Sequence, residues 1–172
     1  MLSAEHFLYF AYGSNMLSRR LCAPERAPSA RIVTTGYIAG HKLTFDKLGK
    51  DGSGKCDALP TGDVSHQVYG VVYEVTRRDR VPLDAAESLG VGYDAARVQV
   101  NTERGTMSAM TYIAKLKQAA LVPFRWYRDL LIAGATENGL PPEYIQRLKA
   151  IPAIEDHDCH RHATHQKLLT AD

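Results

Sequence analysis

The chain has 172 residues, of which 45% are hydrophobic and 23% are charged, and its formal net charge is +2. This composition predicts one globular domain with a sizeable core, and so small a charge, with no long run of lysine or arginine, argues against binding to nucleic acid. No apolar stretch is long enough to span a membrane, and the N-terminus lacks the basic region of a signal peptide. The three cysteines, Cys22, Cys56 and Cys159, are far apart and form no CxxC motif. They predict reduced thiols and a cytoplasmic location.

The first predicted element is a strand over residues 7–12, because every position in FLYFAY is apolar or aromatic. A tight turn at Gly13-Ser14-Asn15 follows, and we expect a helix from Met16 to Leu21 with Ser14 or Asn15 as its N-cap. Such a connection points free backbone N–H groups and the positive end of a helix dipole at the edge of a sheet, where an anion is stabilised. It is equally common as a connection without a ligand.

The middle of the chain predicts mostly strands, and its end predicts helices. Strands are expected as a pair within 32–45, at 56–59 and at 67–75, with a hairpin of 97–101 and 106–113. A short helix is expected within 76–87, and two longer helices over 124–134 and 141–151. Strands followed by helices indicate an α+β fold with a curled or closed sheet. We expect one domain over residues 1–153 and a loose, polar, His-rich tail over 154–172.

Two segments resemble a phosphate-binding loop and a zinc site, but neither has the surrounding structure that such a site needs. Residues 49–56, GKDGSGKC, nearly match a phosphate-binding loop, but Cys56 replaces the hydroxyl that holds Mg²⁺, and Pro60 prevents a following helix. We expect a mobile loop there, with Lys47, Lys50 and Lys55 in solvent rather than on a leaving group's carboxylate. The tail histidines could bind zinc, but they crowd a terminal segment with no apolar support. We therefore expect no metal site and no cofactor.

Asp84 and Glu87 stand one helical turn apart in LDAAE, and two carboxylates on one face can divide acid–base work. Such a pair is usually only a solvated helix face. Here the flexible residues 88–92, SLGVG, follow Glu87 directly. Functional side chains concentrate at such ends of elements, which makes Glu87 a candidate acid/base.

Taken together, YFAYGSNM at residues 9–16, LDAAE at 83–87 and GATENGLPPEYIQRLKAI at 134–151 resemble the gamma-glutamylcyclotransferase family over roughly residues 6–151. The resemblance implies a small mixed β-barrel with surrounding helices. It implies Glu87 as the catalytic acid/base and a substrate pocket formed by seven residues: Tyr12, Gly13, Ser14, Asn15, Tyr93, Tyr112 and Tyr127. Ser88 departs from the family, which commonly has glycine after the catalytic glutamate.

The implied activity converts a γ-glutamyl amino acid to 5-oxoproline and the free amino acid without a cofactor. The expected partner is therefore a small-molecule γ-glutamyl substrate, and a homodimer is the assembly we consider. Two other functions stay open at this point. One is a γ-glutamylamine cyclotransferase or a related amide-cleaving or acyl-transfer enzyme of a biosynthetic pathway. The other is a binding module of the same fold without turnover.

Overall fold

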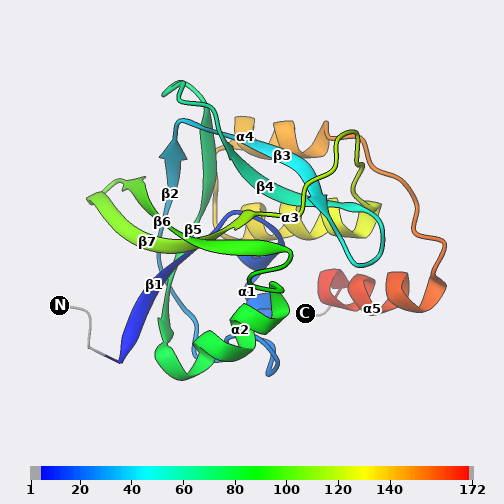
Figure 1. Cartoon of the computed structure of the whole chain (residues 1–172), viewed down its shortest axis with the longest axis horizontal. Coiled ribbons are helices and arrows are strands. Elements are labelled where there is room, and N and C mark those ends of the chain that lie inside the picture. Colours follow the sequence, from blue (N-terminus) through cyan, green and yellow to red (C-terminus); the bar gives the residue numbers. More distant parts are fainter. Residues whose placement is uncertain (1–4, 171–172) are drawn as a thin grey trace.

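The computed structural model describes residues 5–170 (Figure 1). Its strands, in chain order, are β1 (His6–Ala11), β2 (Arg31–Ala39), β3 (His41–Leu48), β4 (Gly54–Pro60), β5 (Gln67–Thr76), β6 (Tyr93–Thr102) and β7 (Gly105–Ala114). Its α-helices are α1 (Ser18–Leu21), α2 (Arg80–Ala86), α3 (Arg125–Glu137), α4 (Pro142–Lys149) and α5 (Cys159–Thr170). Two 3₁₀ turns, η1 (Ser14–Met16) and η2 (Arg77–Asp79), precede α1 and α2.

Five strands form a closed barrel in the order β1-β5-β2-β6-β7. β1 runs antiparallel to β5, with Tyr9 opposite Tyr73, and it closes the barrel by parallel pairing with β7 at Tyr9 and Met110. The predicted α+β class with a mixed barrel is therefore confirmed. Glycine is required at Gly36, because a Cβ there would lie 2.4 Å from the carbonyl oxygen of Asn101 on the neighbouring strand β6.

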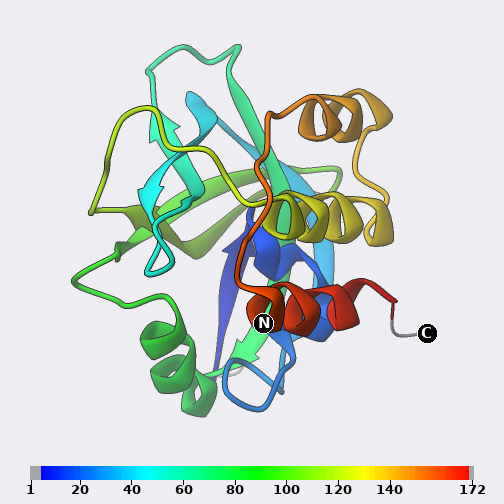
Figure 2. The same cartoon turned by 90° about the vertical axis from the view of Figure 1, so that its right-hand side faces the viewer.

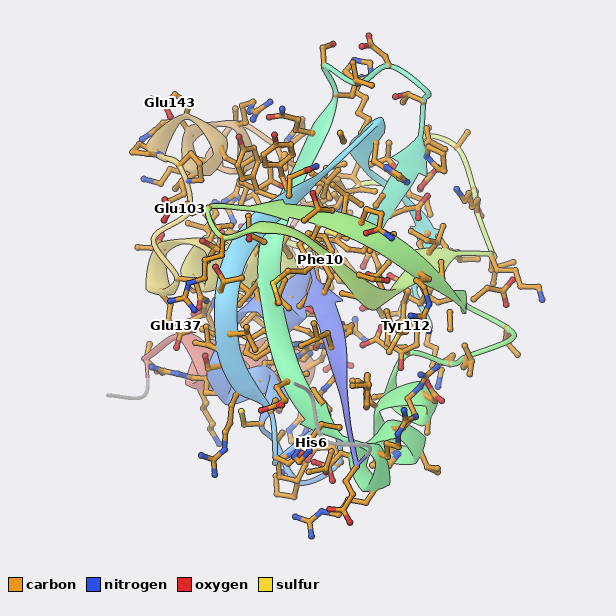
Figure 3. All side chains as sticks on the ribbon, turned by 90° about the vertical axis from the view of Figure 1, so that its left-hand side faces the viewer. His6, Phe10, Glu103, Tyr112, Glu137 and Glu143 are labelled. Carbon is orange, nitrogen blue, oxygen red and sulfur yellow. The ribbon has the colours of Figure 1, made fainter. Side chains whose placement is uncertain are left out.

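The predicted strand at residues 7–12 is confirmed as β1. Its continuous apolar run reflects burial on both faces, because consecutive side chains of a strand point to opposite sides. Tyr9 is 4% exposed and Phe10 is fully buried. Figure 3 shows Phe10 among the barrel strands, whereas Glu103 and Glu143 lie at the periphery.

β3 and β4 form a separate antiparallel hairpin beside the barrel. The phosphate-loop-like residues 49–56 form its turn and the start of β4, not a strand–loop–helix unit. The expectation of a mobile, solvated loop is wrong for most of this turn. Lys47 and Ser53 are 7% and 3% exposed, and Lys55 pairs with Asp51 at 2.7 Å.

The helices α4, α3 and α5 lie side by side along one side of the barrel (Figure 2). α3 and α4 confirm two predicted helices, but the expectation of a loose tail is wrong for Cys159–Thr170. The buried carboxylate of Asp156 anchors this segment by accepting hydrogen bonds from Trp126 Nε1 (2.8 Å) and Arg161 Nε (2.6 Å). The division of the chain at residue 153 stays a prediction. Within residues 5–170, none of the helices has the length and apolar character needed to cross a membrane.

Candidate active site

The loop that follows β1 carries Gly13, Ser14 and Asn15 into a narrow pocket. The expected helix from Met16 to Leu21 is wrong: η1 covers Ser14–Met16, and α1 has only four residues. An extended backbone at Leu17 (ψ 114°) separates the two, and neither Ser14 nor Asn15 caps a helix. Neither of the two elements that follow this loop is therefore a long helix whose dipole could stabilise an anion there.

Tertiary contacts hold the loop in place. The backbone carbonyl of Met16 accepts hydrogen bonds from Tyr73 Oη (2.8 Å) and Asn138 Nδ2 (2.9 Å). α3 approaches so closely that a Cβ on Gly134 would lie 2.5 Å from the backbone nitrogen of Leu17. These contacts fix the loop's backbone, because neither partner has room to shift.

The carboxylate of Glu87 lies beside this loop, although the two are 72 residues apart in sequence. Glu87 caps the C-terminus of α2, and its Oε1 accepts hydrogen bonds from Asn15 Nδ2 (2.9 Å) and Arg26 Nη1 (3.2 Å). Arg26 Nη1 also donates to Asn15 Oδ1 (3.1 Å), and Asn15 Nδ2 donates to Tyr9 Oη (3.0 Å). The four side chains form one network that orients the Glu87 carboxylate.

Ser88 adopts a left-handed backbone conformation, with φ +52°. This conformation favours glycine, because a Cβ adds steric strain there. Serine at position 88, where the family commonly has glycine, therefore leaves the turn intact but strains its backbone. Gly92 N donates to the carbonyl of Ser88 at 2.8 Å and closes the turn beside Glu87.

All eight residues expected at the site line one inner pocket, together with Tyr9 and Cys56. The full lining is Tyr9, Tyr12, Gly13, Ser14, Asn15, Cys56, Glu87, Tyr93, Tyr112 and Tyr127. The predicted residues are thus brought together, while their roles stay a prediction. The volume of this pocket is about 30 Å³, so a substrate must extend beyond it.

Three of the four predicted tyrosines use their hydroxyl groups to hold the protein together. Tyr12 Oη donates to the backbone carbonyl of Tyr112 (2.5 Å). Tyr112 Oη donates to Asp84 Oδ1 (2.5 Å), which also accepts a hydrogen bond from Arg80 Nε (2.7 Å). Tyr93 Oη donates to the carbonyl of Cys56 (2.8 Å). Asp84 is not among the lining residues, and its side chain contacts one of them, Tyr112.

Tyr127 and Cys56 form the floor of the pocket. Tyr127 Oη accepts a hydrogen bond from the backbone nitrogen of Cys56 (3.1 Å). Burial raises the pKa of the Tyr127 phenol and raises the pKa of the Cys56 thiol to about 12. Cys56 is therefore a neutral thiol at physiological pH, which makes it a poor nucleophile.

A larger cavity of about 430 Å³ opens from the inner pocket, and we call it the outer chamber. Ser14, Glu87, Tyr93 and Tyr127 line both spaces, so the Glu87 carboxylate lies at their junction. The volume of the chamber is in the range of small-molecule sites.

The outer chamber contains residues that the sequence reasoning missed or placed in solvent. Lys47, Lys50 and Lys55 line it, together with Arg20 and Arg26. Lys47 and Lys55 were expected in a solvated loop, which is wrong; only Lys50 is exposed. Nothing in the sequence placed Arg20 and Arg26 at the site, because charged residues near Pro24 and Pro28 are typical of an exposed loop.

Helix α5 closes one side of the outer chamber with Arg161 and His165. The His165 imidazole stacks on Trp126 at a centroid distance of 3.7 Å and an interplanar angle of 16°. Burial, with the neighbouring charge of Arg20, lowers the pKa of His165 to about 4, so the ring is neutral at pH 7. The described residues hold no cluster of three or more histidine, cysteine or acidic side chains able to bind a metal.

Comparisons with known proteins show which family the chain is similar to. A model of the AIG2-like family matches residues 67–148. A gamma-glutamylcyclotransferase from Homo sapiens is 33% identical over 156 residues, covering 86% of this chain and 79% of the relative. The relative of that name from Mus musculus is 33% identical over 160 residues, covering 88% and 81%.

Solved structures show the same relationship. One described as a gamma-glutamyl cyclotransferase superimposes with a TM-score of 0.83 at 28% identity, covering 95% of this chain and 99% of that chain. The crystal structure of an uncharacterized Homo sapiens protein, LOC79017, gives a TM-score of 0.82 at 29% identity with the same coverage. Since sequence identity, coverage and fold agree, the chain belongs to the gamma-glutamylcyclotransferase family.

Proposed function

We propose that the chain converts a γ-glutamyl amino acid, or a related γ-glutamyl amide, to 5-oxoproline and the free amine. The observation that carries this proposal is the position of the Glu87 carboxylate at the junction of the inner pocket and the outer chamber. A glutamyl group bound near the loop at Gly13–Asn15 would present its γ-carbonyl there, with the leaving amine in the outer chamber. The names of the relatives support the same reaction.

The reaction is an internal transfer that consumes no water. The nitrogen of the substrate's α-amine attacks the γ-carbonyl carbon, a carbon–nitrogen bond forms, and the bond to the leaving nitrogen breaks. Because attacking and attacked groups belong to one molecule, much of the entropy cost is removed when the cyclising conformer is bound. One proton must pass from the attacking nitrogen to the leaving nitrogen.

Glu87 is our candidate for that proton transfer. Within residues 5–170, its hydrogen bonds from Asn15 and Arg26 both fall on Oε1, which leaves Oε2 to exchange a proton with the substrate. Arg26 balances the charge of the carboxylate at 3.2 Å. The lone general acid/base favours ring closure over a mechanism with an enzyme nucleophile.

The Gly13–Asn15 loop is our candidate for holding an anion. The first N–H groups of a helical turn have no acceptor within the turn, so the amides at the start of η1 can bind the glutamyl α-carboxylate or the developing oxyanion. Tyr12, Tyr93, Tyr112 and Tyr127 shape the pocket around the glutamyl chain. We also propose a cytoplasmic location, which is supported by cysteines 22, 56 and 159 forming no disulfide. A homodimer stays a prediction.

The test is turnover in ¹⁸O-labelled water with γ-glutamylalanine. Ring closure releases 5-oxoproline with no label in the ring carbonyl, whereas hydrolysis releases glutamate labelled in its γ-carboxylate. An N-acetylated substrate, whose amine cannot attack, must stay intact. Labelled glutamate as the primary product, or turnover of the acetylated substrate, would reject the proposal.

A further inference from the structure

The outer chamber has more positive charge than its own acidic groups neutralise. Six cationic side chains line it, against two carboxylates. Arg26 pairs with Glu87, Lys55 pairs with Asp51, and Arg161 is paired by acidic groups of its own segment outside the chamber. Within residues 5–170, the remaining cations Arg20, Lys47 and Lys50 form no ion pair.

Of these unpaired cations, Lys47 is buried where it lines the chamber, and Arg20 is half-buried with a buried Nε atom. The Lys47 side chain packs against Gly92, its ammonium lies 4.9 Å from the centroid of the Tyr93 ring, and the residue is only 7% exposed. The Nε atom of Arg20 is buried and has no hydrogen-bond partner in the described part of the chain. A buried cation without a counter-charge is costly, so this pair indicates a bound anion.

Arg20 keeps its positive charge available to a ligand. Burial lowers the pKa of Arg20 to about 10, which leaves its guanidinium protonated at neutral pH, and burial also lowers the pKa of Lys47. Arg20 comes from α1 and Lys47 from β3, so they approach the chamber from separate elements. Two separate cations suit two anionic groups better than one.

We propose that the departing amine is a dicarboxylic amino acid, whose two carboxylates pair with Arg20 and Lys47. This inference rests on the proposed function and narrows its substrate class to γ-glutamyl compounds such as γ-glutamylglutamate and γ-glutamylaspartate. Ring closure then releases 5-oxoproline and the dicarboxylic amino acid, with the proton from the α-amine passing to the leaving nitrogen. A cationic leaving group such as a polyamine is repelled by the same side chains.

The test compares substrates that differ in one charge and hardly in shape. We expect kcat/KM for γ-glutamylglutamate to exceed that for γ-glutamylglutamine by at least about tenfold at low salt, and this preference to shrink as salt screens the charges. We expect the same preference in kcat/KM for γ-glutamylaspartate over γ-glutamylasparagine. Equal values within either pair, or a preference for γ-glutamylcadaverine, would overturn the inference.

Variants connect the preference to the two cations. Lys47→Met and Arg20→Met should each reduce the glutamate-to-glutamine ratio to below about threefold. Lys149→Met removes the same charge from an exposed position on α4 and should leave the ratio unchanged. A ratio that stays at the parent value in a folded Lys47→Met protein would overturn the inference even if Arg20→Met does not fold.

Product binding separates a failure of this inference from a failure of the proposed function. Titration calorimetry with free L-glutamate and L-glutamine reports on the outer chamber whether or not any substrate turns over. Tighter binding of glutamate, lost in Lys47→Met, supports the dicarboxylate site even if no 5-oxoproline is released. Equal binding of the two amino acids rejects it while leaving cyclisation of other substrates intact.

Discussion

Replacing Glu87 by glutamine is the sharpest test of the mechanism, because it removes the proton-transferring group with little change in shape. The amide is nearly isosteric, and its oxygen can still accept the hydrogen bonds from Asn15 and Arg26 that now reach Oε1 at 2.9 and 3.2 Å. Losing a general acid/base costs at least about a hundredfold in kcat, or about 2.7 kcal/mol of activation free energy. We therefore expect Glu87→Gln to bind substrate and to turn it over at least about a hundredfold more slowly.

The same substitution also has a predictable effect on stability. The Arg26 and Glu87 side chains are 15% and 17% exposed, so neutralising one leaves the other partly buried without its counter-ion. That loss costs about 1–3 kcal/mol, and about 2 kcal/mol would lower Tm by about 4–8 °C in a chain of this size. The assay is 5-oxoproline release measured well below the Tm of the variant, alongside its thermal unfolding curve.

Glu103→Gln is the matched control, because it removes the same charge from the exposed turn between β6 and β7 (Figure 3). It should leave kcat unchanged. A folded Glu87→Gln protein with kcat within about threefold of the parent would refute the role of Glu87.

Three further substitutions test the surroundings of the site. Asp84→Asn weakens the acceptor that holds the Tyr112 hydroxyl at 2.5 Å, so kcat/KM should fall about tenfold or less, and a loss as large as that of Glu87→Gln would contradict a supporting role. Ser88→Gly relieves a left-handed backbone at φ +52° and should raise the free energy of unfolding by up to about 1 kcal/mol; a lower Tm would argue against strain there. For His165, the folded pKa of about 4 lies below the ordinary value of 6.5, so the unfolded chain binds more protons between these values, and stability should fall by about 1–2 kcal/mol from pH 7 to pH 5. His165→Phe keeps the stack on Trp126 and should abolish this fall in stability between pH 7 and pH 5. The free energy of unfolding is measured at each pH by denaturant unfolding followed by tryptophan fluorescence. An equal fall in parent and variant would refute the role of His165.

Local pattern in the sequence determined the elements that carry their own signal. The apolar run of β1, the turn between β6 and β7, and the helical spacing in α3 and α4 were all predicted, because strand and helix periodicities place apolar side chains on buried faces. Glu87 and the Gly13–Asn15 turn were identified for a different reason. They stand in short motifs whose spacing resembles a known family.

Only the tertiary structure decided how the charged side chains are used. Arg26 is 61 residues from Glu87 in sequence, and Arg20 and Lys47 meet at one cavity from different elements. A charged residue has no periodic signal to distinguish a solvated position from a buried one, because its partner is chosen by the packing of distant segments.

Helix α5 shows the same dependence on distant contacts. Its polar, His-rich sequence buries no residue completely and predicts a loose tail. The helix is held by contacts made only after folding: Arg161 with Asp156, and His165 with Trp126. Composition alone determined that this segment is polar, whereas contacts with Asp156 and with α3 decided that it packs as a helix beside the outer chamber.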